Sequence, residues 1–146
     1  MHPNVISQDE ARVAELVRSA RRVAVLGIKT EAQSGQPAFY VPATLHAGGV
    51  EIVPVPVYFP EVTEILGARV YRRVADVPGD LDIVDVFRRS RDVAAHVDDI
   101  LAKRPRAVWL QSSIRDDAAA ERWAQAGILV VQDRCLMVDW QHYTHR

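Results

Sequence analysis

The chain has 146 residues, of which 49% are apolar and 25% charged, and its formal net charge of −1 gives no basic excess that would indicate nucleic-acid binding. The length suits one domain with a sizeable core, and no apolar run approaches the length of a membrane span. A single cysteine, Cys135, excludes an intramolecular disulfide and favours a reducing compartment. We therefore expect one cytoplasmic domain with no nucleic-acid partner and no membrane partner.

The first predicted elements are a helix and a strand. Ser7 and Glu10 have the spacing of a capping box, which predicts a helix over about residues 7–20 with one apolar stripe. The stretch of residues 22–26, which is apolar from residue 23, ends at Gly27 and is typical of a strand buried on both faces of a parallel sheet. Gly27 lets the backbone turn sharply, and we expect a side chain there to meet either a ligand or the following helix.

A second helix and strand follow a polar loop. The helix is predicted to start near Pro37, to be distorted at Pro42 and to end at Gly48. Residues 51–57 form the next strand, and their two prolines at alternate positions predict that one edge of this strand is unpaired. Residues 61–66 are expected to form a short helical turn, and residues 74–78 a turn or short helix.

The second half repeats the alternation of strands and helices. Ser90 is a plausible N-cap for a helix that carries an apolar face as far as residue 103. Strands are predicted at residues 81–87, 107–111 and 128–132, and further helices at 116–126 and 136–143.

This order predicts an α/β fold of the Rossmann-like, doubly wound class, in which a five-stranded parallel sheet carries helices on both faces. We expect a single domain over residues 1–146, with a core at about 22–133 and a tail from about 134. In such sheets a ligand lies beyond the carboxyl ends of the strands, at the point where the strand order reverses.

Catalytic and nucleotide motifs are mostly missing. The loop G-I-K-T-E-A-Q-S-G lacks G-x-G-x-x-G, and the second strand ends in Val57-Tyr58-Phe59, where dinucleotide-binding proteins carry an acidic residue. No G-x-S-x-G frames a serine, and the histidines show no metal-ligand spacing. The candidate general bases are Asp85, Asp133 and Glu31.

Several segments carry a family resemblance. V-A-V-L-G, I-V-P-V-P, I-L-G-A-R-V-Y-R-R-V-A-D-V-P, D-I-V-D-V-F-R-R-S and V-V-Q-D-R-C resemble the small stand-alone coenzyme A-binding proteins, over about residues 15–140. Those proteins are similar to the nucleotide-binding domain of the succinyl-CoA synthetase alpha subunit. The resemblance implies non-catalytic binding of coenzyme A (CoA) or an acyl-CoA, with any protein partner unknown. The alternative is a small enzyme or enzyme subunit that uses another nucleotide cofactor, such as NAD(P).

By position, the resemblance implies a set of ligand-binding residues in three groups. The first group would hold the pyrophosphate, the second would line the adenosine side, and the third would flank the pantetheine arm. The groups are Gly27, Ile28, Lys29 and Thr30; Val57, Tyr58 and Phe59; and Phe87, Arg88, Arg89, Ser90, Gln111, Ser112, Ser113 and Ile114.

The chain departs from the family pattern in two places and from the synthetase in a third. Pro42 interrupts the first crossover helix, and the turn Q-S-S-I after the fourth strand lacks the usual glycine. Where the synthetase has a lysine for the adenosine phosphate, this chain has Tyr58 and Phe59, so that phosphate needs another partner.

The side chains themselves suit the same ligand. Lys29, Arg88 and Arg89 supply positive charge, Thr30 and Ser34 supply hydroxyls, and Tyr58 and Phe59 offer aromatic faces for a base. Because successive side chains of a strand point to opposite faces, we expect Arg88 and Arg89 to diverge, with Arg88 as the phosphate contact.

Overall fold

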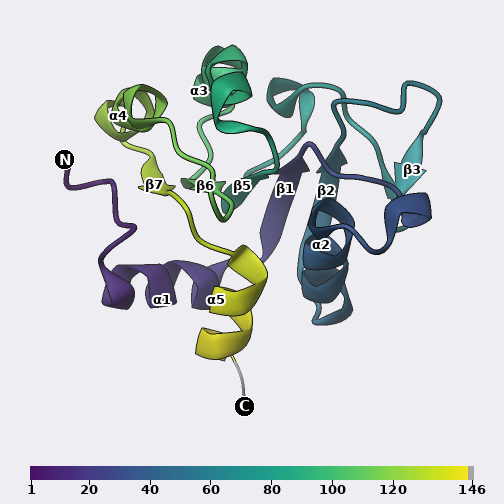
Figure 1. The fold of residues 1–146 in the computed structure, drawn as a ribbon, viewed down its shortest axis with the longest axis horizontal. Coiled ribbons are helices and arrows are strands. Elements are labelled where there is room, and N and C mark those ends of the chain that lie inside the picture. Colours follow the sequence, from purple (N-terminus) through teal and green to yellow (C-terminus); the bar gives the residue numbers. More distant parts are fainter. Residues whose placement is uncertain (145–146) are drawn as a thin grey trace.

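The computed structural model of the chain describes residues 1–144 and contains a five-stranded parallel sheet in the order β2-β1-β5-β6-β7 (Figure 1). The strands are β1 (Arg22–Leu26), β2 (Glu51–Val55), β5 (Ile83–Val86), β6 (Ala107–Leu110) and β7 (Leu129–Val131). The order reverses between β1 and β5, as the sequence predicted. The α/β, Rossmann-like fold class is therefore confirmed.

Helices cover both faces of the sheet (Figure 1). The helices α3 (Val97–Lys103) and α4 (Asp117–Gln125) pack on one face, while α1 (Glu10–Ser19), α2 (Pro37–Ala47) and α5 (Leu136–Thr144) pack on the other. Alternate side chains of each strand enter two separate apolar cores. None of the helices in residues 1–144 is both long and apolar enough to span a bilayer.

The start of α1 differs from the prediction. Asp9, rather than Ser7, caps the helix and accepts a hydrogen bond from the backbone N–H of Arg12 at 3.2 Å. The Ser7 hydroxyl instead accepts a hydrogen bond from the backbone N–H of Gln132 at 2.8 Å. The predicted capping box is wrong because the segment before α1 lies along β7, where Val5 pairs with Val130.

The prolines fall where the fold accepts them. Pro37 begins α2 in its first turn, and the helix continues through Pro42. Pro54 lies in β2, which is an edge strand of the sheet, and its carbonyl accepts a hydrogen bond from the backbone N–H of Tyr71 at 3.0 Å. An edge strand can lack a backbone donor without interrupting the ladder of hydrogen bonds.

Two local predictions are wrong. Residues 61–66 form no helical turn; instead β3 (Glu64–Ile65) and β4 (Ala68–Arg69) make a short antiparallel hairpin. Leu66 and Gly67 turn this hairpin with φ of 53° and 74°, the left-handed pair of a tight turn. Ser90 is not an N-cap, because Arg89 holds that position before a 3-10 helix (Ser90–His96) that leads into α3. The predicted short helix near residue 74 is present as Val74–Asp76.

Candidate functional site

The loops that follow β1, β2, β5 and β6 form the carboxyl edge of the sheet, and Gly27 is at its centre. Gly27 has φ +85°, and a Cβ on it would lie 2.3 Å from the carbonyl oxygen of Phe87 and 3.4 Å from Cδ of Arg88. Among protein neighbours, a side chain at Gly27 would thus meet the loop after β5 rather than the following helix. The turn after β1 is packed directly against the backbone that presents Arg88.

The loop after Gly27 is held by its own hydrogen bonds. Ile28 is buried in the core, and the backbone N–H of Lys29 donates to the carbonyl of Ala38 at 3.1 Å. Thr30 caps a 3-10 helix (Glu31–Gln33), and its hydroxyl donates to Oε1 of Gln33 at 2.7 Å. Lys29 is half-buried and its ammonium donates to the side chain of Gln36. The conformation of the loop is therefore fixed by its own hydrogen bonds, and the Lys29 ammonium supplies a positive charge in it.

Arg88 crosses the carboxyl edge from β5 toward the loop after β2. Its Nε donates to Nε2 of His96 at 3.1 Å, and its Nη1 donates to the Tyr58 hydroxyl at 3.4 Å. The guanidinium lies 5.7 Å from the centre of the Tyr58 ring, within the range of a cation–π interaction. Arg88, Tyr58 and His96 therefore form one cluster, although β1 lies between β5 and β2.

Arg89 points elsewhere. Its side chain is 68% exposed, against 15% for Arg88, and its Nε lies 3.4 Å from a carboxylate oxygen of Asp92. Asp92 is also within 4.0 Å of Nη2 of Arg88. The two arginines diverge as the alternation of strand side chains predicted, and only Arg88 turns toward the loop after β2.

The cluster shifts the pKa values of two members. A hydrogen bond from Arg88, and then its charge, lower the pKa of Tyr58. Burial, and then the charge of Arg88, lower the pKa of His96 from its usual 6.5. The lowered pKa favours neutral His96 at neutral pH, and its unprotonated Nε2 accepts a hydrogen bond from Arg88 Nε.

The backbone of the loop after β2 is fixed by hydrogen bonds from Arg72, a residue that was not predicted from the sequence as part of the site. The guanidinium of Arg72 donates to the carbonyls of Tyr58 at 3.2 Å, Phe59 at 3.0 Å and Val62 at 2.6 Å. Phe59 has φ 63°, so the backbone turns sharply there, and the Tyr58 side chain is left 57% exposed. The run Y-R-R was visible in the sequence, but nothing local indicates which carbonyls its arginines bind.

The β6 side of the edge is more closely tied to the core. Gln111 is buried, and its Oε1 accepts a hydrogen bond from the backbone N–H of Leu136 at 3.1 Å, which fixes the start of α5. Ser112 and Ser113 are exposed, and Ile114 is partly buried against the core. Ser113 adopts φ 71° and donates its backbone N–H to Asp133 at 2.5 Å. Ser113 thus holds a left-handed conformation that favours glycine.

Charge is divided along the edge. Lys29, Arg88 and Arg89 follow β1 and β5, whereas Asp116, Asp117 and Asp133 follow β6 and β7. Two arginines also follow β6 and β7, but both are paired with carboxylates: Arg115 with Asp117 at 3.0 Å, and Arg134 with Glu10 at 2.6 Å and Asp139 at 2.8 Å. Anionic groups of a ligand are therefore favoured over β1 and β5 and disfavoured over β6 and β7.

Asp85 is a buried acid in the middle of the sheet. It is 1% exposed, it lies between Val25 and Trp109 on the neighbouring strands, and its carboxylate oxygens have no hydrogen-bond partner among residues 1–144. Burial raises its pKa well above the usual 3.8. Burial therefore favours the protonated form of this carboxyl, which lies in the sheet below the carboxyl edge.

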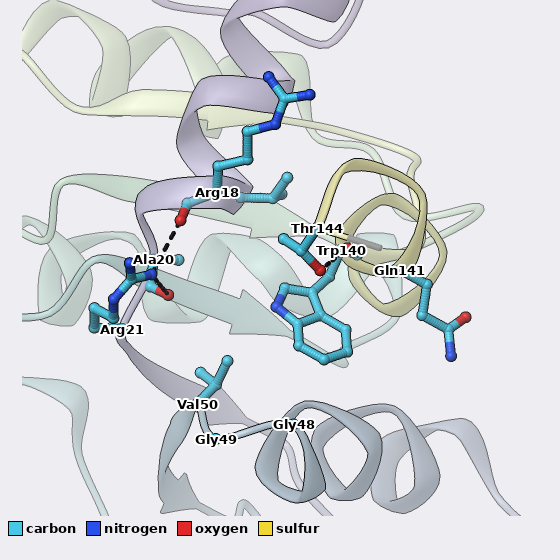
Figure 2. Close-up of a pocket in the computed structure, with 10 residues that line it drawn as sticks. Arg18, Ala20, Arg21, Gly48, Gly49, Val50, Trp140, Gln141 and Thr144 are labelled. Atoms are coloured by element: carbon cyan, nitrogen blue, oxygen red, sulfur yellow. Dashed lines mark hydrogen bonds between the residues drawn. The ribbon is translucent and has the colours of Figure 1, made fainter. Parts of the chain in front are cut away.

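A cavity of about 540 Å³ opens at the opposite, amino edge of the sheet (Figure 2). It is lined by the end of α1, the turn after α2, and one face of α5, with the Trp140 indole pointing into it. The guanidiniums of Arg18 and Arg21 donate to backbone carbonyls of Tyr143 and Arg18, at 2.9 and 3.0 Å. Two arginines therefore line this cavity, on the side of the sheet opposite the carboxyl edge. Among the described residues, no cluster of three His, Cys, Asp or Glu could bind a metal ion.

A doubly wound parallel sheet with cations and aromatic side chains at its carboxyl edge is the architecture of a Rossmann-like ligand-binding domain. Residues 21–141 match the family model described as the CoA binding domain, and the chain belongs to that family.

Three comparisons illustrate the relationship. The Bacillus subtilis protein YneT is 26% identical over 129 residues, which are 88% of this chain and 92% of that protein. A solved Thermus thermophilus structure is 34% identical, with a TM-score of 0.84 over 93% of this chain and 99% of that one. The dinucleotide-forming acetyl-coenzyme A synthetase 1 of Ca. Korarchaeum cryptofilum shares the fold at 19% identity and a TM-score of 0.64, over 75% of this chain and 25% of its own.

Proposed function

We propose that the protein binds CoA or an acyl-CoA across the carboxyl edge of its sheet and has no catalytic activity of its own. Membership of the CoA binding domain family supports the ligand class. The observation that carries the proposal is the placement of Arg88, which brings a largely buried cation to the exposed ring of Tyr58 beside the Gly27 turn. A cation suited to a phosphate and an aromatic ring suited to an adenine thereby lie side by side.

The division of charge gives the ligand an orientation. CoA carries its phosphates at the adenosine end and a long, nearly neutral arm at the other. The phosphates are attracted to Lys29 and Arg88, and the exposed ring of Tyr58 offers a stacking face for the adenine. The pantetheine arm then extends over β6, past Ser112 and Ser113, toward the acidic end where a second anionic group would be repelled.

The alternative of an enzyme that uses NAD lacks supporting groups. Val57, Tyr58 and Phe59 follow β2, so no carboxylate there can hold a ribose hydroxyl pair. Of the candidate bases, Asp85 is sealed in the core, Glu31 accepts a hydrogen bond from the backbone N–H of Leu66, and Asp133 accepts one from Ser113. Two of the three carboxylates therefore hold loops together, and the third is inaccessible.

Calorimetric titration of the purified protein with CoA, NAD and ATP tests the proposal. We expect CoA to bind more tightly than either of the others. Mass spectrometry under non-denaturing conditions is a second readout, because a co-purified CoA species adds its own mass. Tighter binding of NAD than of CoA would overturn the assignment of ligand class.

The absence of catalysis is tested separately. The protein is incubated with acetyl-CoA and succinyl-CoA, and free thiol release is followed. We expect no release above the rate without protein. A rate that scales with protein concentration and is lost in Asp133→Asn or Cys135→Ser would show that the chain is an enzyme.

A further inference from the structure

We infer that Arg88 recognises the ribose 3′-phosphate of CoA and so makes the protein discriminate CoA from dephospho-CoA. This inference rests on the proposed function, and it assigns one particular phosphate of the ligand to the cluster of Arg88, Tyr58 and His96. CoA has two separate anionic groups, a pyrophosphate on the 5′ side of the ribose and a monoester on its 3′ oxygen. Two of the cations at the carboxyl edge are correspondingly separate, Lys29 after β1 and Arg88 beside the loop after β2.

The position of Arg88 favours the monoester. Its guanidinium is fixed against the ring and hydroxyl of Tyr58, at 5.7 and 3.4 Å. Tyr58 is the most exposed aromatic surface of the loop after β2, and is therefore the best stacking face for adenine in that loop. A phosphate on the ribose is the anionic group nearest to an adenine stacked there. The pyrophosphate, further along the ligand, reaches the Gly27 turn and Lys29.

The geometry of Arg88 also suits a phosphate monoester. Nε is already used by His96 at 3.1 Å, and this bond fixes the plane of the guanidinium. Nη1 and Nη2 have only long contacts, 3.4 Å to Tyr58 and 4.0 Å to Asp92. Two parallel N–H groups on a largely buried arginine can bind two oxygens of one phosphate group, and the monoester carries up to about two negative charges.

His96 is the positioning residue of this arrangement. Its Nε2 can hold Arg88 only while it is unprotonated, and burial lowers the pKa of His96, which keeps it so at neutral pH. The charged groups around the cluster are Arg88 and Arg89 on one side and Asp92 and Asp99 on the other. The asymmetry in exposure between Arg88 and Arg89 provides a matched control for charge alone, since both follow β5.

The test is a cycle of two ligands and three proteins, by calorimetric titration of CoA and dephospho-CoA into wild type, Arg88→Gln and Arg89→Gln. We expect wild type to prefer CoA by about tenfold or more. In Arg88→Gln the affinity for CoA should fall about tenfold to a hundredfold, while dephospho-CoA changes less than about threefold, so that the preference disappears. Arg89→Gln should leave both affinities within about threefold.

Each other outcome has a defined meaning. Equal losses for both ligands in Arg88→Gln would overturn the inference, because Arg88 would then contact a part that the ligands share. A wild type that binds both ligands equally would also overturn it. Failure of wild type to bind either ligand would overturn the proposed function and the inference together. If Arg88→Gln does not fold, Arg88→Lys keeps the charge without the paired donors, and an undiminished preference for CoA in that variant would contradict paired recognition.

Discussion

Gly27→Ala tests whether the turn after β1 depends on close packing against the loop after β5. The conformational penalty of an L-residue at φ +85° is about 1–2 kcal/mol. The added Cβ would also lie 2.3 Å from the carbonyl oxygen of Phe87, and forcing that backbone to move costs about 1–3 kcal/mol more. We therefore expect Gly27→Ala to lower the free energy of unfolding by about 2–5 kcal/mol.

Gly127→Ala is the matched control. Gly127 has φ +87°, nearly the same as Gly27, but a Cβ there would meet nothing within 4 Å. Its loss should therefore be confined to the conformational penalty, about 1–2 kcal/mol. Urea denaturation followed by the fluorescence of the buried Trp109 and Trp123 measures both losses. Equal losses in the two variants would refute the packing argument, because the carbonyl of Phe87 would then contribute nothing.

Two further substitutions test strain and burial elsewhere. Asp85→Val should raise the free energy of unfolding at neutral pH by about 1–3 kcal/mol, because it removes a buried carboxyl without a partner. In wild type the folded-state pKa of Asp85 lies above the unfolded value near 3.8. The folded state is therefore most stable, as far as Asp85 is concerned, below that pH, and this stability is lost as the pH rises through the folded pKa. Denaturation over a pH series should show this loss in wild type and not in Asp85→Val; a parallel pH dependence in both would contradict it. Ser113→Gly should stabilise the protein by up to about 1 kcal/mol, because glycine adopts φ 71° without strain, and a lower melting temperature would exclude strain at that turn.

The sheet could be predicted from the sequence because its signal is local. Runs such as residues 23–26 and 107–110 are apolar without alternation, which is the pattern of strands with both faces buried. Gly27, Gly48 and Gly127 lie at or just past the ends of β1, α2 and α4. The carboxyl edge follows from the topology alone, since all five strands are parallel.

The details of the candidate site depend on contacts between distant segments, which local patterns do not encode. The pairing of Arg88 with Tyr58 joins residues 30 positions apart, and Arg72 binds carbonyls 10 to 14 positions earlier. Ser7 was predicted to cap α1, but its hydroxyl instead accepts a hydrogen bond from the backbone N–H of Gln132, which is 125 positions away. No local pattern indicates a role for His96, because its hydrogen bond with Arg88 depends on how the chain folds after β5.

The most direct test of CoA binding at the carboxyl edge is to map the binding by nuclear magnetic resonance. Isotope-labelled protein is titrated with CoA, and the shifts of backbone amides and of the Trp140 indole N–H are followed. The account predicts large changes at Gly27, Tyr58 and Arg88, and little change in the Trp140 indole, which faces the cavity at the amino edge. The opposite pattern, with Trp140 and Gly49 shifting while Gly27 and Arg88 stay fixed, would contradict the central claim.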